Sequence, residues 1–474
     1  MPQSLMPQSP QLGPNLISIV PRLAVTATRG GSPAPTAARS ASNIPDAFHA
    51  WAVQAGTELL ILESTGLLTV PQGTTYSLSG AGFQFDAEVV ATPSASNVTN
   101  PITLRLSSPA QRPAFDALIG SQRKVHHIEI CEQRDVESSD RNHGLAPYSF
   151  MPCALPELAW DELDTRVKFL DRTFDAPILI TGMTGGVERG RDINHNLARA
   201  AAAARIPMGV GSQRLALDDE RFADVFNVKK EVPDVFLIGN IGAAQLVGGR
   251  SQKAARELCL RAVSMISADA LAIHVNVLQE MIQMEGDRDF RKVLDCIAYI
   301  TKDFPVPVVV KEVGAGMDPR TAVRLVDAGV KVIDVGGRGG TSWGWIEGLR
   351  AADPLTLDLA QSFRDWGLTT GMALAMTRQA IPPTIDCQLI ATGGIRTGVD
   401  VAKVVALGAT MAGVGLPLFR AALKSTNDVA TTLDQLIKGL KTVMMCTGTR
   451  ELPGLAEALF HNDSHHHKKR EPLP

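Results

Sequence analysis

The stretch ALAIHVNVLQE, residues 270–280, joins a continuous apolar run to four polar side chains at its end. In a β-strand the side chains of residues i and i+2 point to the same face, so His274 and Asn276 share one face. Gln279 and Glu280 follow immediately. A continuous apolar strand is typical of a parallel sheet covered on both faces. Its polar end therefore indicates a site at one edge of such a sheet.

Seven further apolar runs recur along the chain, separated by Ala-, Leu- and Arg-rich segments that suit helices. Eight strands that alternate with helices favour a closed (β/α)8 barrel over an open sheet. We therefore predict an α/β fold, a TIM barrel with an N-terminal extension. The predicted strands are residues 176–181, 206–211, 235–241, 270–276, 306–313, 330–337, 388–394 and 411–417.

Polar or glycine-rich residues follow every one of these runs, for example TGMTGG after the first and TGGIR after the seventh. Loops are commonly polar, so one such tail would carry little weight. Active sites of (β/α)8 barrels lie at the C-terminal ends of the strands. The same feature after all eight runs therefore predicts an active site at that end of the barrel.

The loops after strands seven and eight predict a phosphate site. In TGGIRTG, Gly393 and Gly394 let backbone N–H groups approach an anion, and a helix start follows. Arg396 can bond phosphate oxygens through its guanidinium group. The segment GVGLP, residues 413–417, would close the other side of this site.

Lys311 ends the fifth predicted strand and should point into the barrel mouth. One reading is a structural ion pair with Glu312 or Asp334, because a buried lysine needs a counter-charge. The other reading is a cation beside an electron-rich flavin ring. Asn240 and Ser212, at the ends of strands three and two, would hydrogen-bond the same ring.

A second group of cations precedes the barrel, in SQRKVHHIEI. A solvated basic turn is one explanation, and the His126–His127 pair lacks the spacing of a metal site. Arg123 and Lys124 suit a diphosphate. Glu280 cannot contact a diphosphate favourably, but it can hold a Mg²⁺ ion that does.

The composition is that of a globular protein without an electrostatic pull toward nucleic acid: 474 residues, net charge -3 and pI about 6.4. Six scattered cysteines without a CxxC pair favour a reducing compartment. The sequence contains no run of 18 apolar residues, so we predict no membrane span. We predict a disordered or targeting tail (1–45), an uncertain extension, possibly a small β appendage (46–115), the barrel domain (120–460) and a disordered tail (461–474).

The ordered set of motifs resembles type 2 isopentenyl-diphosphate isomerase, an FMN-dependent (β/α)8 family. The resemblance covers about residues 123–450 and rests on RK..H, MTGG, MGVGSQR, GNIGAAQL, H.N..QE, EGDRDF, VKEVG.G, GGTSW..IE, DWG and ATGGIRTGVDVAKVVALGA. It implies interconversion of isopentenyl and dimethylallyl diphosphate by a 1,3-proton shift in isoprenoid biosynthesis. The implied cofactors are FMN in its reduced form, Mg²⁺, and NADPH as the reductant of the flavin.

The resemblance also implies site residues. The catalytic set is Gln279, His274 and Lys311, and the metal ligand is Glu280. The substrate set is Arg123, Lys124, His127, Arg214, Asn276 and Gln279. The FMN set is Gly182, Met183, Thr184, Ser212, Asn240, Lys311, Gly336, Thr341, Gly394, Ile395, Arg396, Gly415 and Leu416.

This chain departs from the family pattern at few positions. Val125 and His126 stand where acidic residues are usual, which would retune diphosphate affinity or pH dependence. Gly336 replaces a usual Ser or Ala, and GVGLP differs from the common GIARP. Trp343, in GGTSW, is either ordinary packing or a wall of the substrate pocket.

Two other functions compete with the isomerase. An FMN-dependent 2-hydroxy-acid oxidase needs a histidine base after the late strands, and no His occurs from Asp334 to the end of strand eight. A non-catalytic scaffold would not need polar groups at all eight strand ends. Barrels of this kind often form tetramers or larger rings, so we expect a homo-oligomer, and the charge and hydropathy predict no nucleic-acid partner and no membrane span. We expect the protein in the cytoplasm, or in an organelle if residues 1–45 are a transit peptide.

Overall fold

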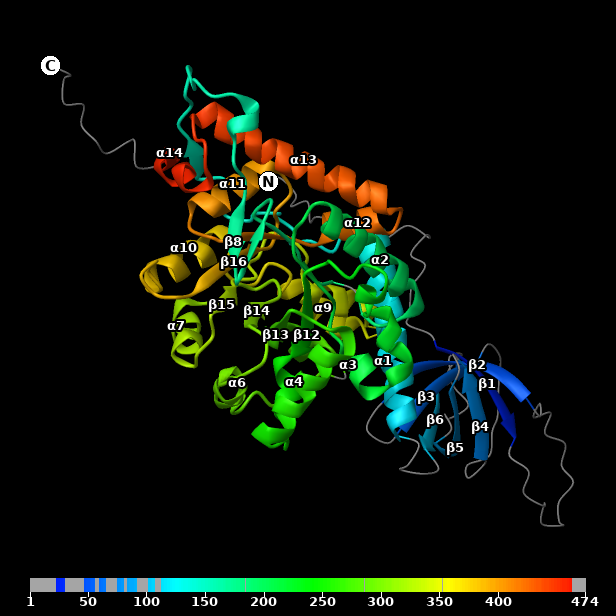
Figure 1. Ribbon diagram of the computed structural model, residues 1–474. Helices are drawn as coiled ribbons and strands as arrows, with labels where there is room; N and C mark the ends of the chain where they lie inside the picture. Colours follow the sequence, from blue (N-terminus) through cyan, green and yellow to red (C-terminus); the bar gives the residue numbers. More distant parts are fainter. Residues whose placement is uncertain are drawn as a thin grey trace, which may run out of the picture. The chain divides into compact units, whose positions relative to one another are not determined.

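The structure is a computed structural model, and it divides the chain into two compact units, Met1–Ser107 and Ser108–Pro474 (Figure 1). In the first unit it describes six strands. In the second unit it describes residues 112–462 apart from Thr184, Glu285 and Ala352. The expected tail at 461–474 lies outside the described residues except for its first two positions.

The first unit is a closed ring of antiparallel strands in the order β1-β2-β3-β6-β5-β4. Closure removes free strand edges, which otherwise invite pairing with other chains. The first strand lies inside the segment 1–45 for which we predicted a disordered or targeting tail, so that segment contains a strand. The strands are β1 Leu23–Arg29, β2 Ala47–Ala55, β3 Leu59–Ser64, β4 Thr75–Gly80, β5 Phe83–Ala91 and β6 Pro101–Leu106.

The second unit contains the predicted (β/α)8 barrel. Eight parallel strands pair in chain order, and β10 pairs with β17 to close the ring, with Ile178 opposite Ala412. All eight predicted strands are confirmed. Their bounds are β10 Ile178–Ile180, β11 Met208–Gly209, β12 Leu237–Gly242, β13 Ala270–Val275, β14 Val308–Glu312, β15 Val332–Asp334, β16 Gln388–Thr392 and β17 Met411–Val414.

Helices surround these strands (Figure 1). Several begin at residues suited to a helix start: Ser251 and Asp318 accept backbone N–H groups, and Thr397 forms a capping box with Asp400. The helices are α1 Arg112–Gln133, α2 Glu188–Ala203, α3 Arg214–Asp218, α4 Gln252–Ile266, α5 Val277–Ile282, α6 Val293–Thr301, α7 Pro319–Asp327, α8 Trp343–Arg350, α9 Pro354–Ser362, α10 Thr370–Ala380, α11 Gly398–Ala406, α12 Leu416–Ala422, α13 Thr426–Thr447 and α14 Leu455–Ala458.

The N-terminal end of the barrel is plugged. The hairpin of β8 Val167–Phe169 and β9 Arg172–Phe174 packs two phenylalanines into the core cluster that holds strand residues such as Ile238 and Val309. The remaining short strands, β7 Tyr148–Phe150 and β18 Leu459–His461, pair with each other. Since the plug closes one end, the opposite, C-terminal end is where a site can open. Within residues 112–462 as described, no helix is both long and apolar enough to cross a membrane.

Candidate active site

Two adjoining cavities lie at the C-terminal ends of the barrel strands. The first contains about 680 Å³ of empty space and the second about 490 Å³, part of each open to solvent. They share five lining residues, so they form one continuous depression. The shared residues are Gly182, Met183, Lys311, Val313 and Trp343.

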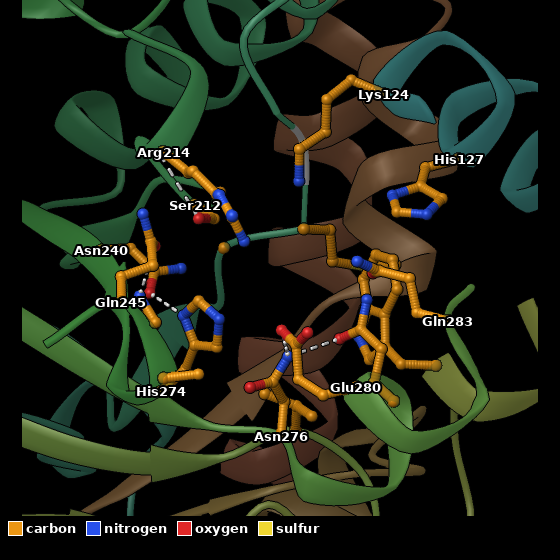
Figure 2. A pocket seen from close by; sticks show the side chains of 18 of the residues that line it. Lys124, His127, Ser212, Arg214, Asn240, Gln245, His274, Asn276, Glu280 and Gln283 are labelled. Carbon is orange, nitrogen blue, oxygen red and sulfur yellow. Dashed lines mark hydrogen bonds between the residues drawn. The ribbon is translucent and has the colours of Figure 1, made fainter. Parts of the chain in front are cut away.

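The first cavity gathers the predicted substrate and catalytic residues from far-apart segments. Figure 2 shows Lys124 and His127 from α1 facing His274, Asn276 and Glu280 across the cavity. All the residues predicted for substrate, catalysis and metal line this one space, and so do Ser212 and Asn240 from the FMN set. The list is Arg123, Lys124, His127, Arg214, His274, Asn276, Gln279, Glu280 and Lys311.

The second cavity gathers most of the predicted flavin residues. Its walls come from the ends of β10, β14, β15, β16 and β17. Ile395 does not line it, because its side chain is fully buried in the core. Thr184 lies outside the described residues. The predicted FMN residues that line the second cavity are Gly182, Met183, Lys311, Gly336, Thr341, Gly394, Arg396, Gly415 and Leu416.

His274 is a neutral imidazole held in one orientation. Asn240 Nδ2 donates to the Val210 carbonyl at 3.0 Å, which turns Asn240 Oδ1 toward His274 Nδ1 at 2.8 Å. His274 Nδ1 therefore carries the proton, and Nε2 keeps a free lone pair. Burial, together with the nearby cations Lys311 and Lys124, lowers the pKa of His274 to about 3.

A chain of side-chain hydrogen bonds runs along the cavity wall on α5. Asn276 Nδ2 donates to Glu280 Oε1 at 2.9 Å and to Gln279 Oε1 at 3.2 Å. Gln279 Nε2 donates to Glu347 Oε1 at 2.9 Å. Asn276 Oδ1 is buried without a hydrogen-bond partner, so it can still accept a hydrogen bond from a ligand or water.

Glu347 is a buried carboxylate that accepts hydrogen bonds from several side chains. His127 Nε2 lies 3.0 Å from its Oε1, and Arg350 Nε donates to its Oε2 at 2.8 Å. Burial opposes ionisation, but Arg350 and His127 together hold the pKa of Glu347 well below its usual range. Burial lowers the pKa of His127 to about 4, against the opposing pull of Glu347. Glu347 is therefore charged and His127 neutral at neutral pH.

The cations of the first cavity lie close enough to influence one another. Burial and the neighbouring Arg123 lower the pKa of Lys124 to about 7. Arg214 Nη1 lies 3.1 Å from Asp287 Oδ2, and the Asp287 N–H donates to Glu280 Oε2 at 2.8 Å. Such a concentration of positive charge favours a polyanionic ligand.

Lys311 lies between the two cavities, and its side chain donates to a backbone carbonyl rather than to a carboxylate. Its Nζ donates to the Glu312 carbonyl at 3.3 Å, and Asp334 and Glu312 partly offset the burial that lowers its pKa. Glu312 Oε2 instead accepts three backbone N–H groups, from residues 314–316. Lys311 is therefore influenced by two nearby carboxyl groups and also lines both cavities.

The predicted phosphate loop forms a cradle of close backbone. Gly394 adopts φ +75°, and a Cβ there would lie 2.6 Å from the Gly339 carbonyl oxygen. A Cβ on Gly415 would lie 2.9 Å from Met183 Sδ. Helix α11 begins directly after the loop, so its first N–H groups are close at hand. Arg396 forms an ion pair with Glu137, which keeps its guanidinium at the cavity.

A metal ion would depend on a single carboxylate here. Among the residues described in the second unit, no group of three His, Cys, Asp or Glu side chains could hold a metal. Both oxygens of Glu280 already accept hydrogen bonds. This donor set fits Mg²⁺ bound by one carboxylate, waters and ligand phosphates rather than by a protein cage.

Several residues at the site were not predicted. Gln245 and Gln283 line the first cavity, and Gln213 positions Asn240 by accepting its backbone N–H at 2.8 Å. Asp287 and Arg350 line neither cavity, but they contact Glu280 and Glu347, respectively. The motifs EGDRDF and MGVGSQR contain Asp287 and Gln213 and were usable signals, whereas no motif quoted above contains Arg350.

Comparisons with known proteins agree with this geometry. A family model described as FMN-dependent dehydrogenase matches residues 250–462. A mutant flavocytochrome b2 with pyruvate bound shares the fold, with a TM-score of 0.52 at 16% identity over 77% of this chain and 88% of that one. At this identity the likeness concerns the fold alone.

Curated relatives are much closer in sequence. Isopentenyl-diphosphate delta-isomerase of Nostoc sp. is 43% identical over 72% of this chain and 95% of that protein. The isomerases of Thermococcus onnurineus and Pseudescherichia vulneris are each 44% identical, over 70% and 71% of this chain and 89% and 95% of those proteins. Together with the FMN-dependent model and the two-cavity barrel mouth, these matches show that the chain belongs to the type 2 isopentenyl-diphosphate delta-isomerase family.

Proposed function

We propose that this protein interconverts isopentenyl diphosphate and dimethylallyl diphosphate by a 1,3-proton shift. The observation that carries the proposal is the meeting of Arg123, Lys124 and Arg214 with neutral His274 and the carboxylate of Glu280 in one cavity. Cations suit a diphosphate, and a proton shift needs groups whose protonation is controlled. The names of the relatives support the same reaction.

The substrate diphosphate binds to the cationic side of the first cavity. Arg123, Lys124 and Arg214 would supply charge-assisted hydrogen bonds to the diphosphate, and Glu280 would be the carboxylate that holds Mg²⁺. The five-carbon chain then extends toward Met183, Val313 and Trp343, which both cavities share. Fixing the diphosphate in this way orients the alkene before any proton moves.

FMN fits the second cavity. The glycine-lined loop after β16, the start of α11 and Arg396 suit its phosphate, and Lys311 suits the negative charge of a reduced ring. When bound, reduced FMN supplies an electron-rich ring against positive charge that develops on the substrate. The reaction itself has no net redox change, so the flavin needs a separate reductant, for which we propose NADPH.

The chain's own residues control orientation and protons. His274 Nε2 offers a lone pair at the wall of the first cavity, and its neutral state persists to pH of about 3. The amide of Gln279 is fixed by Asn276 on one side and Glu347 on the other. Preorganised polar groups of this kind lower the barrier because they need no rearrangement during the reaction.

Anaerobic assay tests the function directly. Purified protein loaded with FMN, chemically reduced and given Mg²⁺ and isopentenyl diphosphate in D₂O should yield deuterated dimethylallyl diphosphate by NMR. The same sample with oxidised FMN should be inactive. No product from the reduced, flavin-loaded protein would contradict the proposed reaction, and equal activity in both redox states would contradict the need for reduced FMN.

The 2-hydroxy-acid oxidase is less favoured. Its fold is shared, but the relatives with more than 40% identity are named isomerases. The segment from β15 to β17 offers no histidine to act as base. Lactate or mandelate should therefore fail to bleach the oxidised flavin under anaerobic conditions.

We also propose that the protein is a homo-oligomer, a tetramer or larger, in the cytoplasm. Large apolar side chains that are exposed in the single chain, such as Leu355 (77%) and Trp366 (60%), support burial against another copy. An organellar location is the alternative if residues 1–45 are a transit peptide. Light scattering and fractionation of the tagged protein test the two statements.

A further inference from the structure

We propose that Arg350 is a positioning residue for the isomerisation: it holds the Glu347 carboxylate in place and, through it, fixes His127 and Gln279 at the wall of the substrate cavity. The proposal rests on the proposed function. Arg350 itself lines neither cavity. It therefore acts through Glu347 rather than by touching substrate or flavin.

The contact between the two residues is short and shielded from water. Arg350 lies at the end of α8, one turn after Glu347, and its Nε donates to Glu347 Oε2 at 2.8 Å. The side chain of Glu347 is completely buried, and that of Arg350 is 10% exposed. A buried carboxylate is costly unless a cation and further hydrogen bonds offset its desolvation.

The two carboxylate oxygens of Glu347 contact different partners. Oε2 faces Arg350, whereas Oε1 accepts from His127 Nε2 at 3.0 Å and from Gln279 Nε2 at 2.9 Å. Rotation of the carboxylate would break both cavity-side contacts. Because Arg350 holds Oε2, it leaves Oε1 fixed toward the cavity.

Arg350 differs from the other cations that face Glu347. Those are Arg123 and Lys124 of α1, which influence Glu347 electrostatically from the cavity side, whereas His127 contacts it as a neutral hydrogen-bond donor. Arg123 and Lys124 are the proposed diphosphate ligands, so in the substrate complex their positive charges would pair with the diphosphate instead of with Glu347. Arg350 then remains as a counter-ion of Glu347 that no ligand recruits.

The consequence extends beyond Glu347. With Gln279 Nε2 directed at Glu347, Gln279 Oε1 faces Asn276 Nδ2, which also donates to Glu280. The donor-to-acceptor direction of these hydrogen bonds therefore depends on Glu347 being ionised, with its Oε1 directed at Gln279. Loss of Arg350 removes that constraint and lets the Gln279 amide reverse.

The test compares Arg350→Met and Arg350→Lys in the flavin-loaded holoenzyme, each also combined with Glu347→Gln. Arg350→Met should lower kcat by about 10- to 100-fold, a loss typical of outer-shell partners, with a smaller change in KM. Arg350→Lys should recover part of the loss because it keeps the charge. In the Glu347→Gln background, Arg350→Met should have little further effect, since residues that act as a unit are non-additive. Arg199→Met, which removes an arginine of α2 paired with Glu231 away from both cavities, is the control and should leave kcat unchanged.

Three results would overturn the proposal: wild-type kcat in Arg350→Met, no advantage of Arg350→Lys over Arg350→Met, or losses that multiply in the Glu347→Gln background. Calorimetric binding of Mg²⁺ with inorganic diphosphate is a second readout that needs no turnover, and Arg350→Met should weaken it. If the wild type lacks isomerase activity but this binding still falls, the proposed function fails and the positioning role stands. If Arg350→Met does not fold, Arg350→Lys and the Glu347→Gln pair carry the same comparison.

Discussion

Lys124 is the residue whose charge at neutral pH is most sensitive to its surroundings. It is half-buried where it lines the first cavity beside Arg123, and burial together with that neighbouring charge lowers its pKa to about 7. Below that pH the lysine is protonated and attracts a diphosphate. Above it the free enzyme loses the charge, and substrate capture weakens as the pH rises.

The first prediction follows from the loss of this positive charge as the pH rises. For the wild type, kcat/KM should decline above pH of about 7, by up to about tenfold per pH unit, because kcat/KM reports the free enzyme. Lys124→Arg should flatten this limb, since guanidinium stays charged at all these pH values. Lys229→Arg, at a lysine paired with Asp269 outside the cavities, should keep the wild-type profile. An unchanged limb in Lys124→Arg would assign the titration to another group.

Glu280 carries the second residue-scale prediction. Its oxygens contact Asn276 and the Asp287 N–H, and a neutral amide in its place would keep the shape but lose the negative charge that we propose binds Mg²⁺. Glu280→Gln should therefore lower Mg²⁺-dependent turnover by at least about 100-fold, since metal contacts contribute several kcal/mol. Glu188→Gln, at an exposed position on α2, is the control. Turnover of Glu280→Gln with the wild-type Mg²⁺ dependence would exclude Glu280 as the ligand.

At the scale of elements, the loop between β16 and α11 depends on left-handed glycines. Gly394→Ala should place a methyl group against the Gly339 carbonyl and force an alanine into φ +75°. We expect FMN affinity to fall by about 5- to 150-fold, which corresponds to the roughly 1–3 kcal/mol of such strain. Gly329→Ala is a matched control, because Gly329 has φ +87° at the end of α7, away from the two cavities. Flavin fluorescence titration measures both, and equal loss in the two variants would refute a local effect.

The hairpin β8–β9 is an element of stability rather than of catalysis. Phe169 is fully buried in the core cluster at the plugged end. Phe169→Ala should cost about 3–5 kcal/mol of unfolding free energy, as large-to-small changes in cores do. Leu155→Ala, at a side chain that is 81% exposed, should cost little. Denaturant titration checks the pair, and a loss of kcat in folded Phe169→Ala at low temperature would contradict the separation of plug and site.

The sequence was most informative where physics is local. Apolar runs marked all eight strands because a buried parallel strand needs apolar side chains on both faces, although β11 is reduced to Met208–Gly209 within the expected 206–211. Residues at strand ends, such as His274 and Lys311, could be assigned to the mouth for the same reason. The pairing of Arg396 with Glu137, 259 residues apart, depends on tertiary placement alone and could not be foreseen. The same holds for Arg350, which contacts the site through Glu347.

At the scale of the whole molecule, the site belongs to one of the two units. Every residue lining the two cavities lies between Arg123 and Leu416, inside Ser108–Pro474. A domain with its own core and closed barrel should fold alone, so residues 108–474 should retain FMN and kcat/KM within about threefold of the full chain. A shorter piece, residues 134–474, lacks α1 with Arg123, Lys124 and His127 and should bind FMN but lose isomerase activity. If residues 108–474 instead fold and bind FMN yet fail to turn over substrate, the N-terminal strands take part in catalysis, and the assignment of the site to the barrel alone is wrong.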